Sequence, residues 1–129
     1  MRFLIDTHVL IWWLKNADRI PRNVRDELSN GRNTVAVSAA SAWEIAIKVK
    51  AGKLDFPQNF LDAFDDNLRA LVFEPLNITA HHAATGAQLP GTHKDPFDRL
   101  IAGQAQADGL TLVSADPVFA SLGIIAFWG

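Results

Sequence analysis

The stretch DPFDRLIAGQAQADGLTLVSAD, residues 95–116, predicts a helix that leads directly into a buried strand. Asp95 followed by Pro96 is a typical helix start, because aspartate caps a first turn and proline suits the first helical position. Gly109 ends the helix, and the apolar run Leu110–Val113 then predicts a strand. A helix that feeds a short buried strand is the repeating unit of α/β domains.

The rest of the chain repeats this alternation on both sides of that stretch. The further runs that predict strands are Arg2–Asp6, Thr34–Val37, Leu71–Phe73 and Ile124–Phe127. Helical patterns cover Val9–Lys15, Pro21–Gly31, Ala42–Lys50, Pro57–Leu68, Thr79–Gln88 and Pro117–Leu122. We therefore expect one α/β domain over residues 1–129, built on a five-stranded parallel sheet. Ligands of such sheets bind beyond the carboxyl ends of the strands, where the winding direction changes.

Composition places the chain among ordinary globular proteins and leaves nucleic acid as a possible ligand. Of its 129 residues 49% are hydrophobic and 20% charged, and there is no cysteine, which excludes disulfides and thiolate metal sites. The net charge is −2, but setting four of the 14 acids aside at a metal site leaves ten against 12 basic residues. We expect a cytoplasmic protein with no membrane span, because no apolar run approaches the required length of roughly 20 residues.

Acidic side chains occupy the positions where a ligand site of this fold is expected. Asp6 follows the first predicted strand and Asp116 follows the fourth, while Asp95 and Asp98 open the helix before it and Glu44 lies early in the helix after the second. Clustered carboxylates repel one another, and a hard divalent cation removes that repulsion. Mg²⁺ or Mn²⁺ held by oxygen ligands is suited to phosphodiester hydrolysis, because it polarises a phosphoryl oxygen and activates water.

This chemistry assigns Asp6, Asp98 and Asp116 as metal ligands, with Glu44 binding metal or orienting water. Each acid also has a purely structural alternative. Asp6, Asp95 and Asp116 have the pattern of helix caps, and Asp98 suits a helix first turn electrostatically. Ser41-Ala42-Trp43-Glu44 matches a capping box, which would leave Glu44 bonded to a backbone amide. The residues by themselves leave both possibilities open.

In four ordered segments the chain resembles the PIN-domain family, and within it VapC-like toxins. They are Phe3-Leu4-Ile5-Asp6-Thr7-His8, Ser38-Ala39-Ala40-Ser41-Ala42-Trp43-Glu44-Ile45, His93-Lys94-Asp95-Pro96-Phe97-Asp98-Arg99-Leu100-Ile101-Ala102 and Leu112-Val113-Ser114-Ala115-Asp116. The resemblance implies a three-layer α/β/α domain with a five-stranded parallel sheet. It further implies a Mg²⁺- or Mn²⁺-dependent endoribonuclease that acts as the toxin of a toxin–antitoxin pair.

The family's acidic quartet falls on Asp6, Glu44, Asp98 and Asp116, with Asp95 as an additional acid. The hydroxyls of Thr7 and Ser114 are candidates to bind metal-bound water, although each also suits a turn or cap. Candidate substrate contacts are Arg99, which could instead form a structural ion pair, and Lys94 on the loop with His93.

Two adjacent tryptophans, Trp12 and Trp13, cannot share one helix face, so we expect one of them to be partly exposed, which suggests a partner surface. The partner would be an antitoxin or a second copy of the chain. The competing functions are a catalytically silent RNA-binding module on this fold and a small Mg²⁺-dependent phosphatase. The phosphatase class requires a second aspartate two residues after the first, where this sequence has His8.

Overall fold

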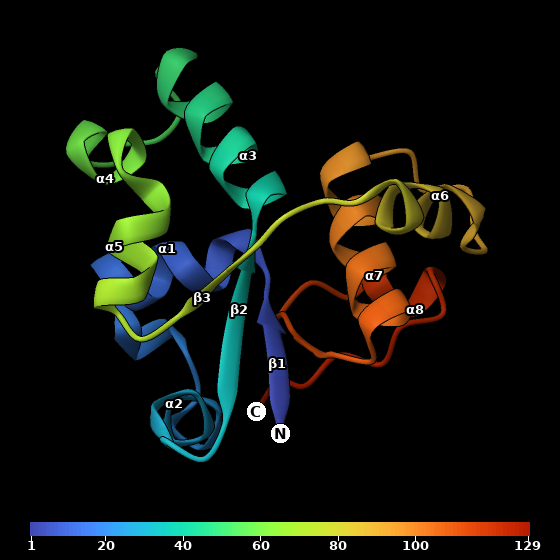
Figure 1. Cartoon of the computed structure of the whole chain (residues 1–129), viewed down its shortest axis with the longest axis horizontal. Helices are drawn as coiled ribbons and strands as arrows, with labels where there is room; N and C mark the ends of the chain where they lie inside the picture. The colour runs from blue at the N-terminus through green and yellow to red at the C-terminus, as the bar shows by residue number, and fades with distance from the viewer.

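The computed structural model describes all residues, 1–129. Strands and helices alternate along the chain (Figure 1). The parallel strands are β1 (Arg2–Ile5), β2 (Thr34–Ser38), β3 (Glu74–Leu76) and β4 (Thr111–Val113). The helices are α1 (Thr7–Lys15), α2 (Arg22–Ser29), α3 (Ala39–Lys50), α4 (Gln58–Asp62), α5 (Phe64–Ala70), α6 (Ala80–Gln88), α7 (Pro96–Asp108) and α8 (Val118–Ser121), with a 3-10 turn at Ala17–Arg19.

The strands form one sheet in the order β3-β2-β1-β4, so β1 lies between β2 and β4. Every neighbouring pair is parallel; Ile5, for example, pairs with Val37 on one side and Val113 on the other. The chain builds outward from β1 in one direction and then returns to its other side. The winding therefore changes between β1 and β4, where ligands of such sheets bind.

Strand side chains alternate between two separate cores, one on each face of the sheet. Phe3 and Ile5 pack into one core with residues of α1, α2, α3 and α5, whereas Leu4 packs into the other with residues of α7 and α8. Figure 1 shows α1, α2 and α5 on one side of the strands and α6, α7 and α8 on the other. The predicted three-layer α/β/α arrangement is confirmed.

The prediction of a fifth strand at Ile124–Phe127 is wrong. Phe127 forms only an isolated bridge with Val113 at the edge of β4. Ile124 is buried in the second core, whereas Ile125 is 94% exposed. The segment follows the left-handed turn at Gly123, where φ is 78°, and it meets the sheet edge at one residue instead of along its length.

The third strand lies three residues later than predicted, because the end of α5 uses Leu71–Phe73. The Phe73 N–H donates to the Leu68 carbonyl at 2.9 Å, and the Val72 N–H donates to the Arg69 carbonyl at 2.9 Å. This pair of bonds closes a helix with a left-handed residue, here Val72 with φ of 62°. The strand that follows contains Pro75, which a sheet tolerates at its edge.

Trp12 and Trp13 are both partly exposed, which agrees with the expectation that one of them would be. Trp12 packs against Trp128 and lies under the Arg19 guanidinium, and Trp13 packs against Phe73.

No helix of the structure is both long enough and apolar enough to cross a bilayer.

Candidate active site

The carboxyl ends of β1 and β4 lie side by side and carry the first acids of the site. The Asp6 N–H donates to the Val113 carbonyl at 3.0 Å, which continues the pairing of the two strands by one residue. Asp6 and Ser114, which follow these strands directly, are therefore brought together from opposite ends of the chain. This is the rim that the sequence predicted as the ligand site.

Asp6 is buried, 4% exposed, and its carboxylate is surrounded by donors. Oδ1 accepts from the Thr7 N–H at 2.8 Å, which is the cap of α1. Oδ2 accepts from the Ser114 hydroxyl at 2.8 Å and lies 3.1 Å from His8 Nδ1. Asp6 can thus cap α1 and also belong to the site, because capping uses only one of its two carboxylate oxygens.

His8 orients Asp6, a role that the sequence analysis did not assign. Its Nε2 accepts from the Ala115 N–H at 3.1 Å. The hydrogen-bond network therefore assigns the ring proton to Nδ1, which donates to Asp6. The ring is packed against Trp12, with centroids 4.7 Å apart. The spacing of His8 from Asp6 matches no known motif, and its second hydrogen-bond partner, Ala115, lies near the far end of the chain.

Asp116 is linked to Asp6 through Ser114. The Ser114 hydroxyl donates to Asp6 and accepts from the Asp116 N–H at 3.0 Å. The Asp116 side chain is exposed, and its Oδ1 accepts from the Val118 N–H at 2.9 Å, as the sequence predicted for a cap. The other side of Asp116 borders a hollow of about 490 Å³ that also includes Ile125.

Asp95 and Asp98 lie at the start of α7 in different roles. Asp95 Oδ1 accepts from the N–H groups of Phe97 and Asp98, which makes Asp95 the helix cap. Asp98 Oδ2 lies 2.8 Å from His93 Nε2. The pKa of Asp98 is raised to about 6, against an ordinary value of 3.8: burial is the main cause, the hydrogen bond from His93 opposes it, and the negative charges of Asp95 and Asp6 add to the rise.

The structure gathers three possible ligand atoms closely, and only Asp98 among them belongs to the predicted quartet. One donor atom each of His93, Asp95 and Asp98 lies within 4.8 Å of the others. Asp6 and Asp116 lie outside this group, and Asp6 contributes through its charge. His93 is thus a site residue that sequence analysis placed only on a loop.

Glu44 lies on α3, and its only ion pair is with Lys48 at 3.1 Å. The predicted capping box at Ser41 is not formed, because the helix begins earlier and Ser38 caps it by accepting from the Ala40 N–H. Trp43, one residue before Glu44, meets Phe97 with ring centroids 4.8 Å apart. This contact joins the start of α3 to the start of α7 beside Asp98.

Two predicted substrate contacts, Thr7 and Ser114, are buried and have protein partners. The Thr7 hydroxyl lies 2.9 Å from the Ser41 hydroxyl, which ties α1 to α3. Ser114 joins Asp6 to Asp116, as described above. Lys94 is exposed on the loop before α7 and forms no ion pair. Of these three side chains, Lys94 is the one free to meet a substrate.

Arg99 turns its guanidinium onto the loop before α7 instead of toward solvent. Its Nε donates to the His93 carbonyl, its Nη1 to the carbonyls of Gly86 and Leu89, and its Nη2 to that of Gly91. Four of its five N–H donors are used in this way. Arg99 therefore has a structural role in place of a free substrate-binding one, although its partners are backbone carbonyls and not the carboxylate of an ion pair.

Comparison with known proteins gives consistent matches at the level of sequence. The sequence model of the family described as PIN domain matches residues 3–125. Ribonuclease VapC16 of Mycobacterium tuberculosis is 39% identical over 80 residues, a match that spans 52% of this chain and 57% of that protein. The tRNA(fMet)-specific endonuclease VapC of Shigella flexneri is 27% identical over 119 residues, 88% of this chain and 86% of that protein.

Solved structures agree on the fold. VapBC2 from Rickettsia felis, bound to a DNA fragment from its promoter, contains a chain with a TM-score of 0.73 at 20% identity and full coverage of both chains. DNA-bound VapBC from Salmonella typhimurium gives 0.71 at 24% identity, covering 98% of this chain and 96% of that one. Because the family model matches nearly the whole length of the chain, residues 3–125, this chain belongs to the PIN domain family.

Proposed function

We propose that this protein is a metal-dependent endoribonuclease that hydrolyses RNA phosphodiester bonds at the carboxylate site around Asp6 and Asp98. The observation that carries the proposal is the raised pKa of Asp98. This carboxyl group is partly buried, and the negative charges of Asp95 and Asp6 act on it. Only the imidazoles of His8 and His93 lie beside these carboxylates, with no lysine or arginine, and carboxylates held this close are disfavoured unless a cation joins them. The names of the two relatives, a ribonuclease and an endonuclease, support the same chemistry.

The donor set fits Mg²⁺ or Mn²⁺. Asp6, Asp98 and Asp116 supply hard oxygen donors, and Asp95 Oδ2 is free because only Oδ1 serves the helix cap. Lys48 already pairs with Glu44, and Arg99 is committed to the loop carbonyls, so neither can neutralise the three aspartates. A divalent cation at this site would supply Lewis-acid activation of water and of the scissile phosphate.

The surrounding side chains hold the carboxylates in place before any substrate arrives. His8 and Ser114 donate to Asp6 Oδ2, which holds the carboxylate in one orientation at the sheet rim. We assign Glu44 to orienting the attacking water, because its only present partner is the exposed and easily displaced Lys48. Lys94 is the exposed cation on the loop before α7, and we assign it to a substrate phosphate.

We further propose that the protein acts as a cytoplasmic toxin neutralised by a cognate antitoxin, and that it forms a homodimer. The solved relatives are described as VapBC complexes, which supports this assignment. A groove of about 780 Å³ between α3 and α4 includes Trp43, whose side chain is 53% exposed. Because Trp43 adjoins Glu44, an antitoxin segment seated in this groove would reach the acidic site.

The nuclease proposal is tested with purified protein and a mixed cellular RNA pool, in Mg²⁺ or Mn²⁺ and in EDTA. We expect discrete fragments that require metal, and a loss of at least about a hundred-fold in rate for Asp6→Asn, which keeps the shape but removes the charge. Asp26→Asn, on the exposed surface of α2, is the matched control and should cleave as the wild type does.

Cleavage that persists in EDTA, or equally in Asp6→Asn, would overturn the metal assignment. RNA binding without any cleavage would favour the catalytically silent RNA-binding module. The toxin role has its own test, in which induced expression should arrest growth, Asp6→Asn should not, and co-expression of the neighbouring antitoxin gene should restore growth.

A further inference from the structure

We propose that His93 is a direct metal ligand, so that the site binds its cation through an imidazole nitrogen as well as carboxylates. This inference rests on the proposed function, since it assumes that a divalent cation occupies the site. It goes beyond the acidic quartet, whose ligands are all oxygens, and it carries a consequence for which cation is preferred.

The first argument is the distance between His93 Nε2 and Asp98 Oδ2, which is 2.8 Å. Adjacent ligands of a six-coordinate ion with bonds of about 2.1 Å lie about 3 Å apart. The pair therefore already has the separation of two neighbouring donors on one ion. A metal that replaced the shared proton would need little movement of either side chain.

The second argument is the position of Asp95. One donor atom of Asp95 lies within 4.8 Å of donor atoms of both His93 and Asp98. Opposite ligands of an octahedral ion are about 4.2 Å apart, so at the 4.8 Å limit the Asp95 carboxylate must move toward the other two donors for all three atoms to bind one cation. The three side chains are partly buried, so each keeps some exposure to solvent.

The third argument is how firmly His93 is held. The Arg99 guanidinium donates to the backbone carbonyl of His93 and also to those of Gly86, Leu89 and Gly91. Arg99, the residue after Asp98 on α7, thus fixes the loop that carries the His93 imidazole. A ligand that is fixed before the metal arrives loses little conformational freedom on binding. Arg99 is, in this assignment, a positioning residue.

A nitrogen ligand changes the expected cation. Mg²⁺ strongly prefers oxygen donors, whereas Mn²⁺ and the later divalent ions accept imidazole readily. With the metal on Nε2, the ring proton resides on Nδ1, for which the structure shows no protein partner and which is free to donate to water. We therefore expect the full chain to bind Mn²⁺ more tightly than Mg²⁺, with His93 responsible for much of the difference.

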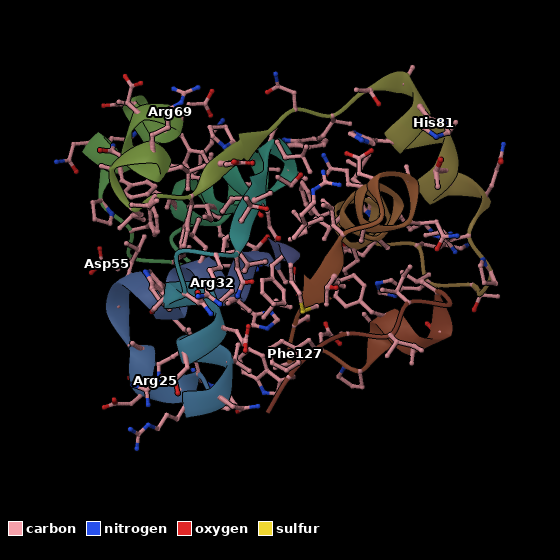
Figure 2. The ribbon with its side chains drawn as sticks, turned by 60° about the horizontal axis from the view of Figure 1, so that its bottom comes forward. Arg25, Arg32, Asp55, Arg69, His81 and Phe127 are labelled. Carbon is pink, nitrogen blue, oxygen red and sulfur yellow. The ribbon has the colours of Figure 1, made fainter.

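The test is pulsed electron paramagnetic resonance of Mn²⁺ bound to the metal-stripped full-length protein. We expect the wild type to show coupling between Mn²⁺ and ¹⁴N, replaced by ¹⁵N coupling when histidine is labelled. His93→Gln should lose the coupling and bind Mn²⁺ at least about ten-fold more weakly, with a smaller loss for Mg²⁺. His81→Gln is the matched control, because His81 is exposed on the outer side of α6 (Figure 2).

His93→Asp guards against a variant that merely fails to fold. It replaces the nitrogen with an oxygen ligand, so Mn²⁺ binding should be retained without ¹⁴N coupling and the preference should shift toward Mg²⁺. Bound Mn²⁺ without nitrogen coupling in the wild type would overturn the role of His93 and leave the proposed metal site intact. No Mn²⁺ binding at all would overturn the proposed function as well.

Discussion

Asp6 and Asp98 carry the same functional group in different surroundings. Asp6 is almost fully buried but receives hydrogen bonds from Thr7, Ser114 and His8. Asp98 has one such partner, His93, and faces the charges of Asp95 and Asp6, so its pKa is raised to about 6. Without a cation, therefore, burial and the neighbouring negative charges disfavour the anion of Asp98.

Asp98 should make the metal-free protein less stable as the pH rises from about 4 to 7. Its folded-state pKa of about 6 exceeds the ordinary value of 3.8, so its stabilising contribution is complete below pH 4 and lost above pH 6. Asp98→Asn should remove this dependence and stabilise the protein at pH 7 by about 1–2 kcal/mol, a figure already reduced for partial solvent screening.

Urea denaturation in EDTA at several pH values between 4 and 7 measures the difference. Asp26→Asn, an exposed substitution on α2, should follow the wild type to within about 0.5 kcal/mol. Parallel curves for the wild type and Asp98→Asn would show that another group controls this pH range.

Arg99 should contribute to folding stability through the shape of its guanidinium as well as its charge. Arg99→Ala would leave the carbonyls of Gly86, Leu89, Gly91 and His93 without their donor, at a cost of about 2–4 kcal/mol. Arg99→Lys should recover little of this loss, because an ammonium cannot span four carbonyls. Chemical denaturation measures the effect.

Arg69→Ala is the control for removing an arginine, because its partner Asp66 is exposed and such a pair contributes well under 1 kcal/mol. If Arg99→Lys were as stable as the wild type but bound RNA weakly, Arg99 would be a phosphate contact after all.

Among the helices, the closest packing is between α6 and α7, and it sets where the loop before α7 runs. A Cβ added at Gly103 would lie 2.6 Å from the Gly86 nitrogen and the His82 carbonyl oxygen, both backbone atoms. Glycines on the facing sides of the two helices therefore allow their backbones to touch. The Arg99 contacts to Gly86 and Leu89 depend on this close approach.

Gly103→Ala should destabilise the protein by about 2–3 kcal/mol, because backbone atoms cannot give way as the end of a flexible side chain can. Thermal unfolding measures the change. Gly31→Ala is the matched control, since nothing lies within 4 Å of its added Cβ, and it should be neutral or slightly stabilising. Equal stabilities for the two variants would mean that α6 can move away from α7 at no cost.

At the scale of the whole molecule, the site joins segments that are far apart in the chain. β1 supplies Asp6, the segment after β4 supplies Ser114 and Asp116, and α7 supplies Asp98. A cation bound across these elements would connect α7 and the segment after β4 to the end of β1. Metal binding should therefore stabilise the fold as a unit.

We expect Mn²⁺ at about a hundred times its dissociation constant to raise the free energy of unfolding by about 2.7 kcal/mol. Thermal unfolding with and without EDTA measures this. Asp6→Asn should abolish most of the increase, whereas Asp26→Asn should retain it. An increase of the same size in Asp6→Asn would place the bound metal elsewhere on the protein.

The sequence by itself determined the order of the elements and the rim that carries the acids. Helix caps, proline and glycine punctuation and apolar runs act over a few neighbouring residues, so Asp95, Pro96 and Gly109 define α7 wherever it packs. The same local rules placed Asp6 directly after β1 and Asp116 three residues after β4, at the strand ends where ligands of such sheets bind. The family resemblance then selected the chemistry.

Only the tertiary structure decided the number of strands and the partners of the polar side chains. Ile124–Phe127 has the composition of a strand, yet its pairing depends on how it meets the edge of β4. His8 and His93 become site residues through atoms brought together by packing, and Arg99 turns inward because the contact of α6 with α7 presents carbonyls to it. Such partners are set by distances in space, which residue spacing along the chain does not encode.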